Sequence, residues 1–285
     1  MATDIPVTAG AALPKLGIIA GAGALPPLLA AACENTGRPY YVLGLSGFAD
    51  AEALSKVGAW IDGWIQLGEI GKGFALLKEA GVADVVMAGA VRRPSLASLK
   101  LDMKGAAFLA RVAGRALGDD GLLSAVIAET EQNGFRVVGA DSILADLLAP
   151  EGVLGKHRPD DAANVDIAYG FDVVRALGTV DVGQAVVVQQ GIVLGVEAAE
   201  GTDALINRCK DLRLDAPGGV LVKARKPNQE RRADLPTIGP LTVHRAVDAG
   251  LRGIAVEAGH TLIIARSETI AAADAAGIFL IGIKS

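Results

Sequence analysis

Short apolar segments alternate with helical patterns through the first half of this chain of 285 residues. The first segment is Leu16-Gly17-Ile18-Ile19-Ala20, and similar segments cover residues 40–45, 83–89 and 135–139. An apolar run without polar alternation is typical of a strand that is buried on both faces. Strands that alternate with helices predict a parallel sheet with helices on both faces. The sequence therefore predicts the α/β class, beginning with a Rossmann-like domain.

The second half contains pairs of apolar segments separated by short turns. Gln190-Gly191 lies between the segments 184–189 and 192–197, and this spacing predicts a β-hairpin. The segments 254–257 and 261–264 predict a second hairpin in the same way. Together with single apolar strands near the C-terminus, these pairs predict a mixed α/β domain.

These patterns divide the chain into three parts. Residues 1–14 show no periodicity and are expected to form a flexible leader. Residues 15–150 are expected to form the Rossmann-like N-terminal domain, and residues 151–285 the mixed C-terminal domain. We expect the C-terminal domain to carry most of the catalytic residues, with a substrate bound between the two domains.

The composition excludes several classes of protein. The longest uncharged run, residues 16–33, is interrupted by glycines and by Pro26-Pro27, whereas a membrane-spanning helix needs about 20 consecutive apolar residues. A net charge of −5 gives no general attraction to nucleic acid, so we expect no such partner. Two cysteines fit a reduced cytoplasmic protein better than a disulfide scaffold.

A glycine-rich turn follows the first predicted strand. Gly21 and Gly23 lie where backbone N–H groups and a helix N-terminus can face a phosphate. The turn lacks the third glycine of the dinucleotide-binding fingerprint, because Pro26 stands there. This departure argues against a sugar or short-chain dehydrogenase. The turn is either a phosphate contact or an ordinary connection between strand and helix.

Adjacent carboxylates follow Gly118. Asp119 and Asp120 precede a predicted helix, and one of them is sufficient to cap it. The second carboxylate exceeds what a cap requires, so the pair is also suited to a metal ion or to sugar hydroxyls. Both interpretations stay open from the residues alone.

Acidic side chains gather where the first hairpin leads into a helix. Glu197, Glu200 and Asp203 lie within seven residues of one another, and oxygen ligands of this kind suit Mg²⁺. The alternative is that Thr202 or Asp203 caps the helix.

The densest set of reactive side chains follows the strand at 219–223. Basic residues there alternate with acids, amides and prolines, whereas a plain solvated charge run lacks such punctuation. Lysine and arginine can hold phosphate oxygens while carboxylates bind a metal or activate water. The residues of this segment that we single out are Lys223, Lys226, Gln229, Arg231, Asp234 and Thr237.

Several segments together resemble one family, the UDP-2,3-diacylglucosamine pyrophosphatases of lipid A biosynthesis in the form known as LpxI. The resemblance spans nearly the whole chain, and its most specific parts are the Glu-Gly-Thr-Asp and Lys-Pro segments. The matching segments are residues 16–26, 87–94, 118–120, 181–188, 197–203 and 226–239.

The resemblance implies an activity. Such an enzyme hydrolyses UDP-2,3-diacylglucosamine to 2,3-diacylglucosamine 1-phosphate (lipid X) and UMP, with Mg²⁺ as cofactor and Mn²⁺ as a substitute. It implies a cytoplasmic protein, peripheral on the inner face of the inner membrane. The expected partners are the diacylated UDP-sugar, lipid X and the membrane surface, and a homodimer is left open.

The resemblance and the residue chemistry together give a set of expected roles. The catalytic group is expected to comprise Asp203, Lys226, Gln229, Arg231 and Asp234. Substrate contacts are expected from Gly21, Gly23, Asp119, Asp120, Gln184, Thr202, Lys223 and Thr237. The expected metal ligands are Glu200, Asp203 and Asp234. A non-catalytic module that binds nucleotide sugars is the alternative, and it has no need of the clustered acids.

Overall fold

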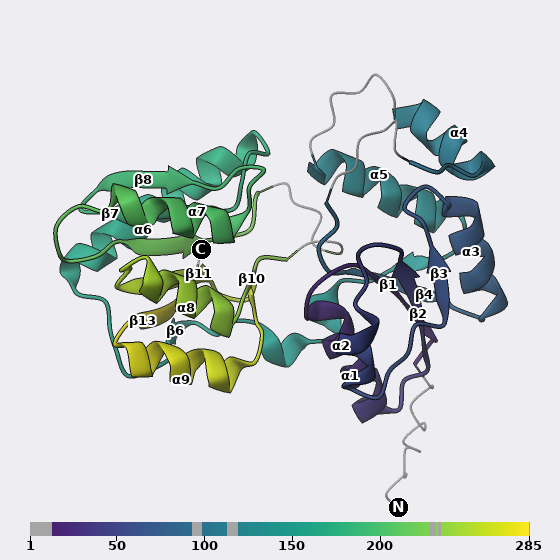
Figure 1. The fold of residues 1–285 in the computed structure, drawn as a ribbon, viewed down its shortest axis with the longest axis horizontal. Coiled ribbons are helices and arrows are strands. Elements are labelled where there is room, and N and C mark those ends of the chain that lie inside the picture. Colours follow the sequence, from purple (N-terminus) through teal and green to yellow (C-terminus); the bar gives the residue numbers. More distant parts are fainter. Residues whose placement is uncertain (1–12, 93–98, 113–118, 228–231, 233–234, 285) are drawn as a thin grey trace, which may run out of the picture. The chain divides into compact units, whose positions relative to one another are not determined.

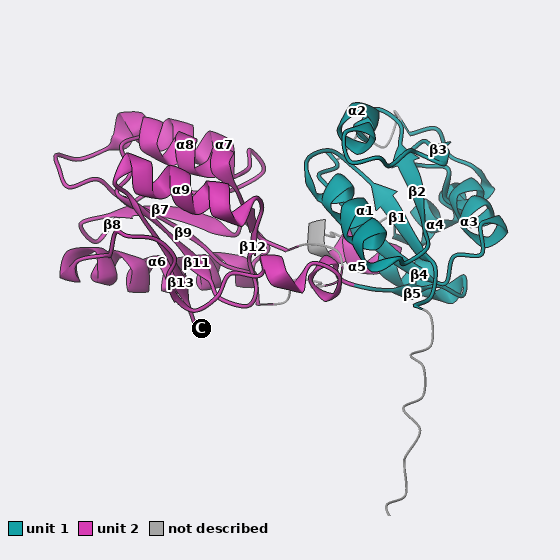
Figure 2. Ribbon diagram, turned by 90° about the horizontal axis from the view of Figure 1, so that it is seen from below, with its two compact units in different colours: residues 1–113, 127–138 teal, residues 114–126, 139–285 magenta. Residues whose placement is uncertain are grey.

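A computed structural model describes residues 13–92, 99–112, 119–227, 232 and 235–284 of the chain. The chain forms two compact units, coloured separately in Figure 2. Unit 1 comprises residues 1–113 and 127–138, and unit 2 comprises residues 114–126 and 139–285. The expected leader falls outside the described residues except for Leu13 and Pro14. Within the described ranges, no helix is both long and apolar enough to cross a membrane.

Unit 1 is built on a parallel sheet with the strand order β3-β2-β1-β4-β5. Figure 1 labels β1 to β4, and Figure 2 labels β5. This is the order of a doubly wound sheet, and it confirms the predicted Rossmann-like architecture. The strands are β1 (Leu16–Ala20), β2 (Tyr40–Leu45), β3 (Gly63–Ile65), β4 (Asp84–Ala88) and β5 (Arg136–Val137). The helices are α1 (Leu25–Thr36), α2 (Ala51–Ser55), α3 (Ile70–Glu79), α4 (Met103–Val112) and α5 (Asp119–Gln132), the last of which crosses the boundary of the units.

The strands of unit 1 are apolar because helices cover them closely. A Cβ atom on Gly17 of β1 would lie 2.9 Å from side-chain carbons of both Leu77 and Val82, so only glycine lets α3 approach the sheet this far. α1 has prolines in its first turn, where no backbone donor is needed, and it ends at Gly37 in the left-handed conformation.

A buried carboxylate lies at the first residue of β4. Asp84 is 2% exposed and accepts hydrogen bonds from Arg136 at 2.6 and 2.7 Å and from Arg38 at 2.6 Å. Arg38 also donates to the carbonyl of Pro14, at the start of the described chain. Asp84 therefore ties β5 and the loop after α1 to the amino end of the sheet.

Unit 2 contains a mixed six-stranded sheet with the order β6-β13-β11-β9-β7-β8. The central strands β9, β11 and β13 are parallel, and β6, β7 and β8 pair antiparallel with their neighbours. These strands are β6 (Gly152–Val153), β7 (Ala185–Gln189), β8 (Ile192–Val196), β9 (Val220–Lys223), β11 (Gly253–Glu257) and β13 (Phe279–Ile283). Two short strands, β10 (Thr237–Ile238) and β12 (Leu262–Ile263), pair in parallel as a separate sheet.

Helices cover both faces of the six-stranded sheet, as Figure 2 shows. α6 (Asp161–Thr179) packs on one face against alternate strand residues such as Val186 and Val222. The opposite face packs against α7 (Thr202–Cys209), α8 (Pro240–Asp248) and α9 (Arg266–Ala276). Because both faces are buried, the interiors of the strands β7, β9 and β11 are apolar, and their polar residues stand at the strand ends.

The two hairpin predictions have different outcomes. β7 and β8 pair antiparallel around Gln190 and Gly191, which confirms the first hairpin. The second prediction is wrong, because β11 pairs in parallel with β9 and β13, so both of its edges are occupied. The turn after β11 is bound by Ala149, which accepts from Gly259 N–H and donates to the carbonyl of Thr261. That contact directs the chain out of the sheet toward β12.

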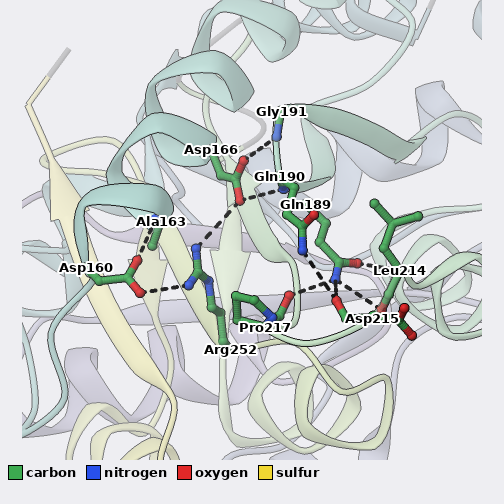
Figure 3. Close-up of polar contacts among 10 residues, drawn as sticks. All are labelled: Asp160, Ala163, Asp166, Gln189, Gln190, Gly191, Leu214, Asp215, Pro217 and Arg252. Atoms are coloured by element: carbon green, nitrogen blue, oxygen red, sulfur yellow. Dashed lines mark hydrogen bonds and ion pairs between the residues drawn. The ribbon is translucent and has the colours of Figure 1, made fainter.

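A buried polar network, drawn in Figure 3, holds the turn of the first hairpin. Asp166 of α6 is 1% exposed and accepts from the backbone N–H groups of Gln190 at 3.0 Å and Gly191 at 2.7 Å. The side-chain amide of Gln189 donates to the carbonyls of Leu214, Asp215 and Pro217. The contacts of Asp166 and Gln189 lie at the Gln189 end of β7. Lys223 lies opposite Ala185, at the other end of this strand.

We expect Asp166→Ala to destabilise the hairpin end of unit 2. The two backbone donors lose their acceptor, and a lost partner of this kind costs about 1–3 kcal/mol. Hydrogen exchange of peptides from residues 185–196 measures the change. Asp172→Ala on the same helix is the control, since that side chain is 77% exposed and its ion pair with Arg175, at 3.9 Å, is its one polar contact among the described residues. Equal exchange in both variants would contradict the assigned role.

Candidate active site

The carboxyl edge of the sheet in unit 2 collects polar side chains from several strands. Lys223 ends β9, Glu257 ends β11, and Glu197 directly follows β8. All three are at least nine-tenths buried. In α/β sheets, ligands bind outside the carboxyl ends of the parallel strands. This edge is therefore the candidate active site within unit 2.

A chain of hydrogen bonds connects four of these positions. The ammonium of Lys223 donates to the hydroxyl of Thr202 at 2.9 Å, and that hydroxyl donates to Glu197 Oε1 at 2.6 Å. Glu197 Oε2 accepts from the backbone N–H of Gln184 at 3.1 Å. Lys223 also donates to the carbonyl of Thr237 at 3.2 Å. The structure thus brings together Gln184, Thr202, Lys223 and Thr237, which were predicted as substrate contacts from distant parts of the sequence.

The environment of Lys223 is unusual for a buried cation. Its described partners are a hydroxyl and a carbonyl, both neutral, and no carboxylate of the described chain pairs with its ammonium. An ammonium has three donors, so one donor remains for a ligand. Thr202 begins α7, whose N-terminal end adds positive potential. An anion beside Lys223 would satisfy both the charge and the remaining donor.

A second buried lysine has an acidic partner. Lys226 is 8% exposed, and its ammonium lies 2.5 Å from Oδ1 of Asp181. Asp181 has a φ of 56°, a left-handed conformation that aspartate tolerates better than most residues. Nearby, Glu257 accepts from the backbone N–H of Arg225 at 2.9 Å, which fixes the chain between the two lysines. Asp181 and Glu257 were not among the predicted site residues, because their partners are far away in the sequence.

The acids expected to bind metal do not form a cluster in the described chain. Glu200 lies 3.0 Å from Arg208, and Asp203 lies 3.3 Å from Arg245. The backbone N–H of Glu200 itself, and then Arg208, lower the pKa of that carboxyl. Among the described residues, no three acidic, histidine or cysteine side chains are placed to hold a metal ion.

Several predicted residues cannot be placed in this arrangement. Gln229, Arg231 and Asp234 lie outside the described residues. Asp119 and Asp120 are the first residues of α5, and only their backbone is described. The roles predicted for all five stay predictions.

The glycine turn of unit 1 is tied to the end of β4. Gly21 N–H donates to the carbonyl of Ala88 at 2.7 Å, and Ala22 and Ala90 exchange two hydrogen bonds of 2.9 Å. The amides of Gly21 and Ala22 are therefore already engaged. Gly23, with a φ of 94°, leads from this bridge into α1. A role of Gly21 and Gly23 in substrate binding stays a prediction.

Comparisons with known proteins follow the two halves of the chain. Residues 15–147 match the model of the LpxI N-terminal domain, and residues 150–281 match that of the LpxI C-terminal domain. The UDP-2,3-diacylglucosamine pyrophosphatase LpxI of Caulobacter vibrioides is 44% identical over 276 residues, covering 94% of this chain and 97% of that protein. Among solved structures, the precorrin-6A reductase CobK is 12% identical, with a TM-score of 0.33 over 95% of this chain and 88% of its own. That likeness is too small to carry an argument.

Proposed function

The chain belongs to the LpxI family, and on that premise we propose that it is a UDP-2,3-diacylglucosamine pyrophosphatase of lipid A biosynthesis. A water oxygen forms a bond to the phosphorus next to the sugar, and the bond from that phosphorus to the bridging oxygen breaks. The bridging oxygen leaves with the uridylyl group. The products are 2,3-diacylglucosamine 1-phosphate and UMP.

The observation that carries this proposal is the buried ammonium of Lys223, whose partners among the described residues are all neutral. A pyrophosphate oxygen at its free donor would supply the missing negative charge. In the trigonal-bipyramidal transition state, negative charge is spread over the equatorial oxygens of the phosphorus, so a fixed ammonium stabilises that state. Thr202 holds the ammonium in place, and Glu197 in turn orients the hydroxyl of Thr202. Lys226 and Arg231 are proposed to bind further phosphate oxygens, and Gln229 to orient the substrate.

We propose Mg²⁺ as the cofactor, with Mn²⁺ as a substitute. Mg²⁺ usually binds through one or two carboxylates, with water and substrate phosphates completing its shell. The candidates are Glu200, Asp203 and Asp234, and we assign activation of the water to Asp203 or Asp234. Mg²⁺ would neutralise phosphate charge when bound.

The acyl chains of the substrate reside in a bilayer, so we propose that the protein acts as a peripheral enzyme at the cytoplasmic face of the inner membrane. We leave a homodimer as a hypothesis for solution measurements. The alternative is a module that binds nucleotide sugars without catalysis, and a turnover assay distinguishes it from an enzyme.

We expect the purified protein to release UMP from UDP-2,3-diacylglucosamine when Mg²⁺ is present. EDTA should abolish release, and added Mg²⁺ or Mn²⁺ should restore it. Asp203→Ala and Asp234→Ala should each lower kcat about 100-fold or more if they act on the metal or the water. UMP is quantified by chromatography. Tight binding of the substrate without turnover would select the binding module, and full activity in both variants would remove these residues from the site.

A further inference from the structure

The helix α4 of unit 1, labelled in Figure 1, has apolar residues on two opposite faces. Its inner face carries Gly105 and Phe108, which are both buried. A Cβ atom on Gly105 would clash with the carbonyl oxygen of Gly68, so only glycine lets the helix approach the loop before α3 this closely. A helix that buries one face in this way is expected to be polar on the other face.

The outer face of α4 does not follow that expectation. Its exposed residues Met103, Ala106, Ala107 and Ala110 have the spacing i, i+3, i+4, i+7, so they form one apolar stripe along the helix. Met103 is 91% exposed, more than any other large apolar side chain among the described residues. Leu101, just before the helix, is exposed as well. The stripe therefore needs a partner from outside the described chain.

Basic side chains accompany the stripe. Lys104 and Arg111 are seven residues apart and lie on the same side of α4, and Lys100 precedes the helix. The ammonium of Lys104 donates to the side-chain carbonyl of Asn133 at 2.6 Å, which is a neutral partner. Lys100 has no polar partner in the part of the chain that the structure describes. Only Arg111 is paired with an acid, Glu129.

The single acid of residues 99–112 is occupied by the backbone. Asp102 accepts from the N–H groups of Lys72 at 3.0 Å and of Gly105 at 2.7 Å, which also anchors this segment to α3. It forms no ion pair with Lys100 or Lys104. The whole chain has a net charge of −5, so this apolar and basic surface differs from the average surface of the protein.

We propose that the outer face of α4, together with Lys100, docks on an anionic lipid bilayer. A basic helix with an apolar stripe is suited to lie in the plane of a bilayer surface, with the stripe at the acyl boundary and the ammonium groups at the headgroups. Long lysine side chains reach the headgroups while the helix enters the interface. Each basic residue near an anionic surface strengthens binding by about 5-fold. The inference rests on the proposed function, because it names the surface that brings the enzyme to the bilayer of its substrate.

Other occupants fit this surface less well. A two-fold contact with a second copy of the chain brings the same patch of both copies together, so Lys100 and Lys104 would meet like charges. A nucleic-acid backbone would satisfy the lysines but would leave the stripe around Met103 without an apolar partner. A bilayer with acidic headgroups offers both kinds of contact at once.

The test measures sedimentation of the full chain with vesicles, without substrate or metal. The vesicles are phosphatidylcholine alone or with about 30% phosphatidylglycerol, and we expect binding to the second kind to be at least 10-fold stronger. Met103→Asp should weaken that binding at least 10-fold, and Lys100→Glu at least 5-fold. The matched controls are Val165→Asp and Lys56→Glu, which change exposed side chains elsewhere and should bind like the wild type.

The outcomes are independent of turnover. Equal vesicle binding by the two variants and the wild type, or no preference for phosphatidylglycerol, overturns the docking surface even if the enzyme releases UMP. Weakened binding in both variants, with unchanged controls, supports it even if substrate in detergent is not hydrolysed. If Met103→Asp converts a dimer to a monomer in light scattering but binds vesicles normally, the surface is a contact between copies and the inference is wrong. Both changed side chains are exposed, and thermal unfolding checks that the variants are folded.

Discussion

Lys223→Met is expected to lower kcat by about 100- to 1,000-fold, the loss typical of removing one fixed group that stabilises charge in a transition state. Methionine preserves most of the length and apolar surface of the lysine stem, so the buried site keeps its packing. What disappears is the ammonium that donates to Thr202 and Thr237 and has a donor to spare. KM should change less than kcat, because charge on the phosphate oxygens grows as the bond breaks.

The control for this variant is Lys210→Met, which removes an exposed lysine of unit 2 and should leave kcat unchanged. Steady-state kinetics with the diacylated UDP-sugar give both parameters, and thermal unfolding shows whether the fold is intact. Lys223→Arg tests geometry, because a planar guanidinium does not reproduce the position of the ammonium. A folded Lys223→Met variant with wild-type kcat would remove this residue from the catalytic machinery.

Asp84→Ala is expected to destabilise unit 1 by about 3 kcal/mol, the lower end of the cost of breaking a buried ion pair. The side chain of Arg38 is only 10% exposed and would lose its carboxylate partner. Hydrogen exchange of peptides from β1 and β4 measures the loss of protection. Peptides from β9 and β11 provide an internal control, since they belong to unit 2. Unchanged protection of β4 would show that Asp84 contributes little.

The same carboxylate predicts how the stability of unit 1 depends on pH. Burial raises the pKa of Asp84, but the hydrogen bonds and charges of Arg136 and Arg38 outweigh it and lower the pKa below the ordinary value. The folded state then binds the proton less tightly than the unfolded state. This stabilisation is fully present above the unfolded pKa of about 3.9 and is lost as the pH falls through the lower folded pKa. As the pH is lowered, the hydrogen-exchange protection of β4 should therefore fall less steeply in Asp84→Ala than in the wild type.

The architecture of unit 1 could be predicted because its strands and helices are encoded locally. A buried parallel strand is largely apolar, as in β1 and in β4 after its first residue, Asp84, and prolines and glycines mark the ends of α1. The pairing of strands in unit 2 was harder to predict. The apolar segments at 254–257 and 261–264 have the spacing of a hairpin, but the neighbours of β11 come from elsewhere in the chain.

The candidate site shows the same limit. Three acids within seven residues suggested one shared metal site, yet the fold points them to different partners. Glu197 is buried and accepts a hydrogen bond from Thr202, whereas Glu200 and Asp203 form ion pairs with Arg208 and Arg245. Sequence spacing shows which side chains are close along the chain, but it does not show which arginines pair with them. The arginines that neutralise two of the acids lie on α7 and on another helix, α8. That Lys223 and Thr202 lie close together could be predicted only from their positions, since Lys223 ends a strand and Thr202 follows one.

The bridge between Ala22 and Ala90 limits which residues the two loops that it joins can hold. Any side chain at Gly21 would place its Cβ 2.9 Å from carbonyl oxygens of Gly89 and Ala90, and one at Gly89 would place it 2.4 Å from the carbonyl of Ala22. The two loops are thus interlocked, and neither can be lengthened or given a bulkier residue without displacing the other. A change of residue in either loop therefore requires a compensating change in the other.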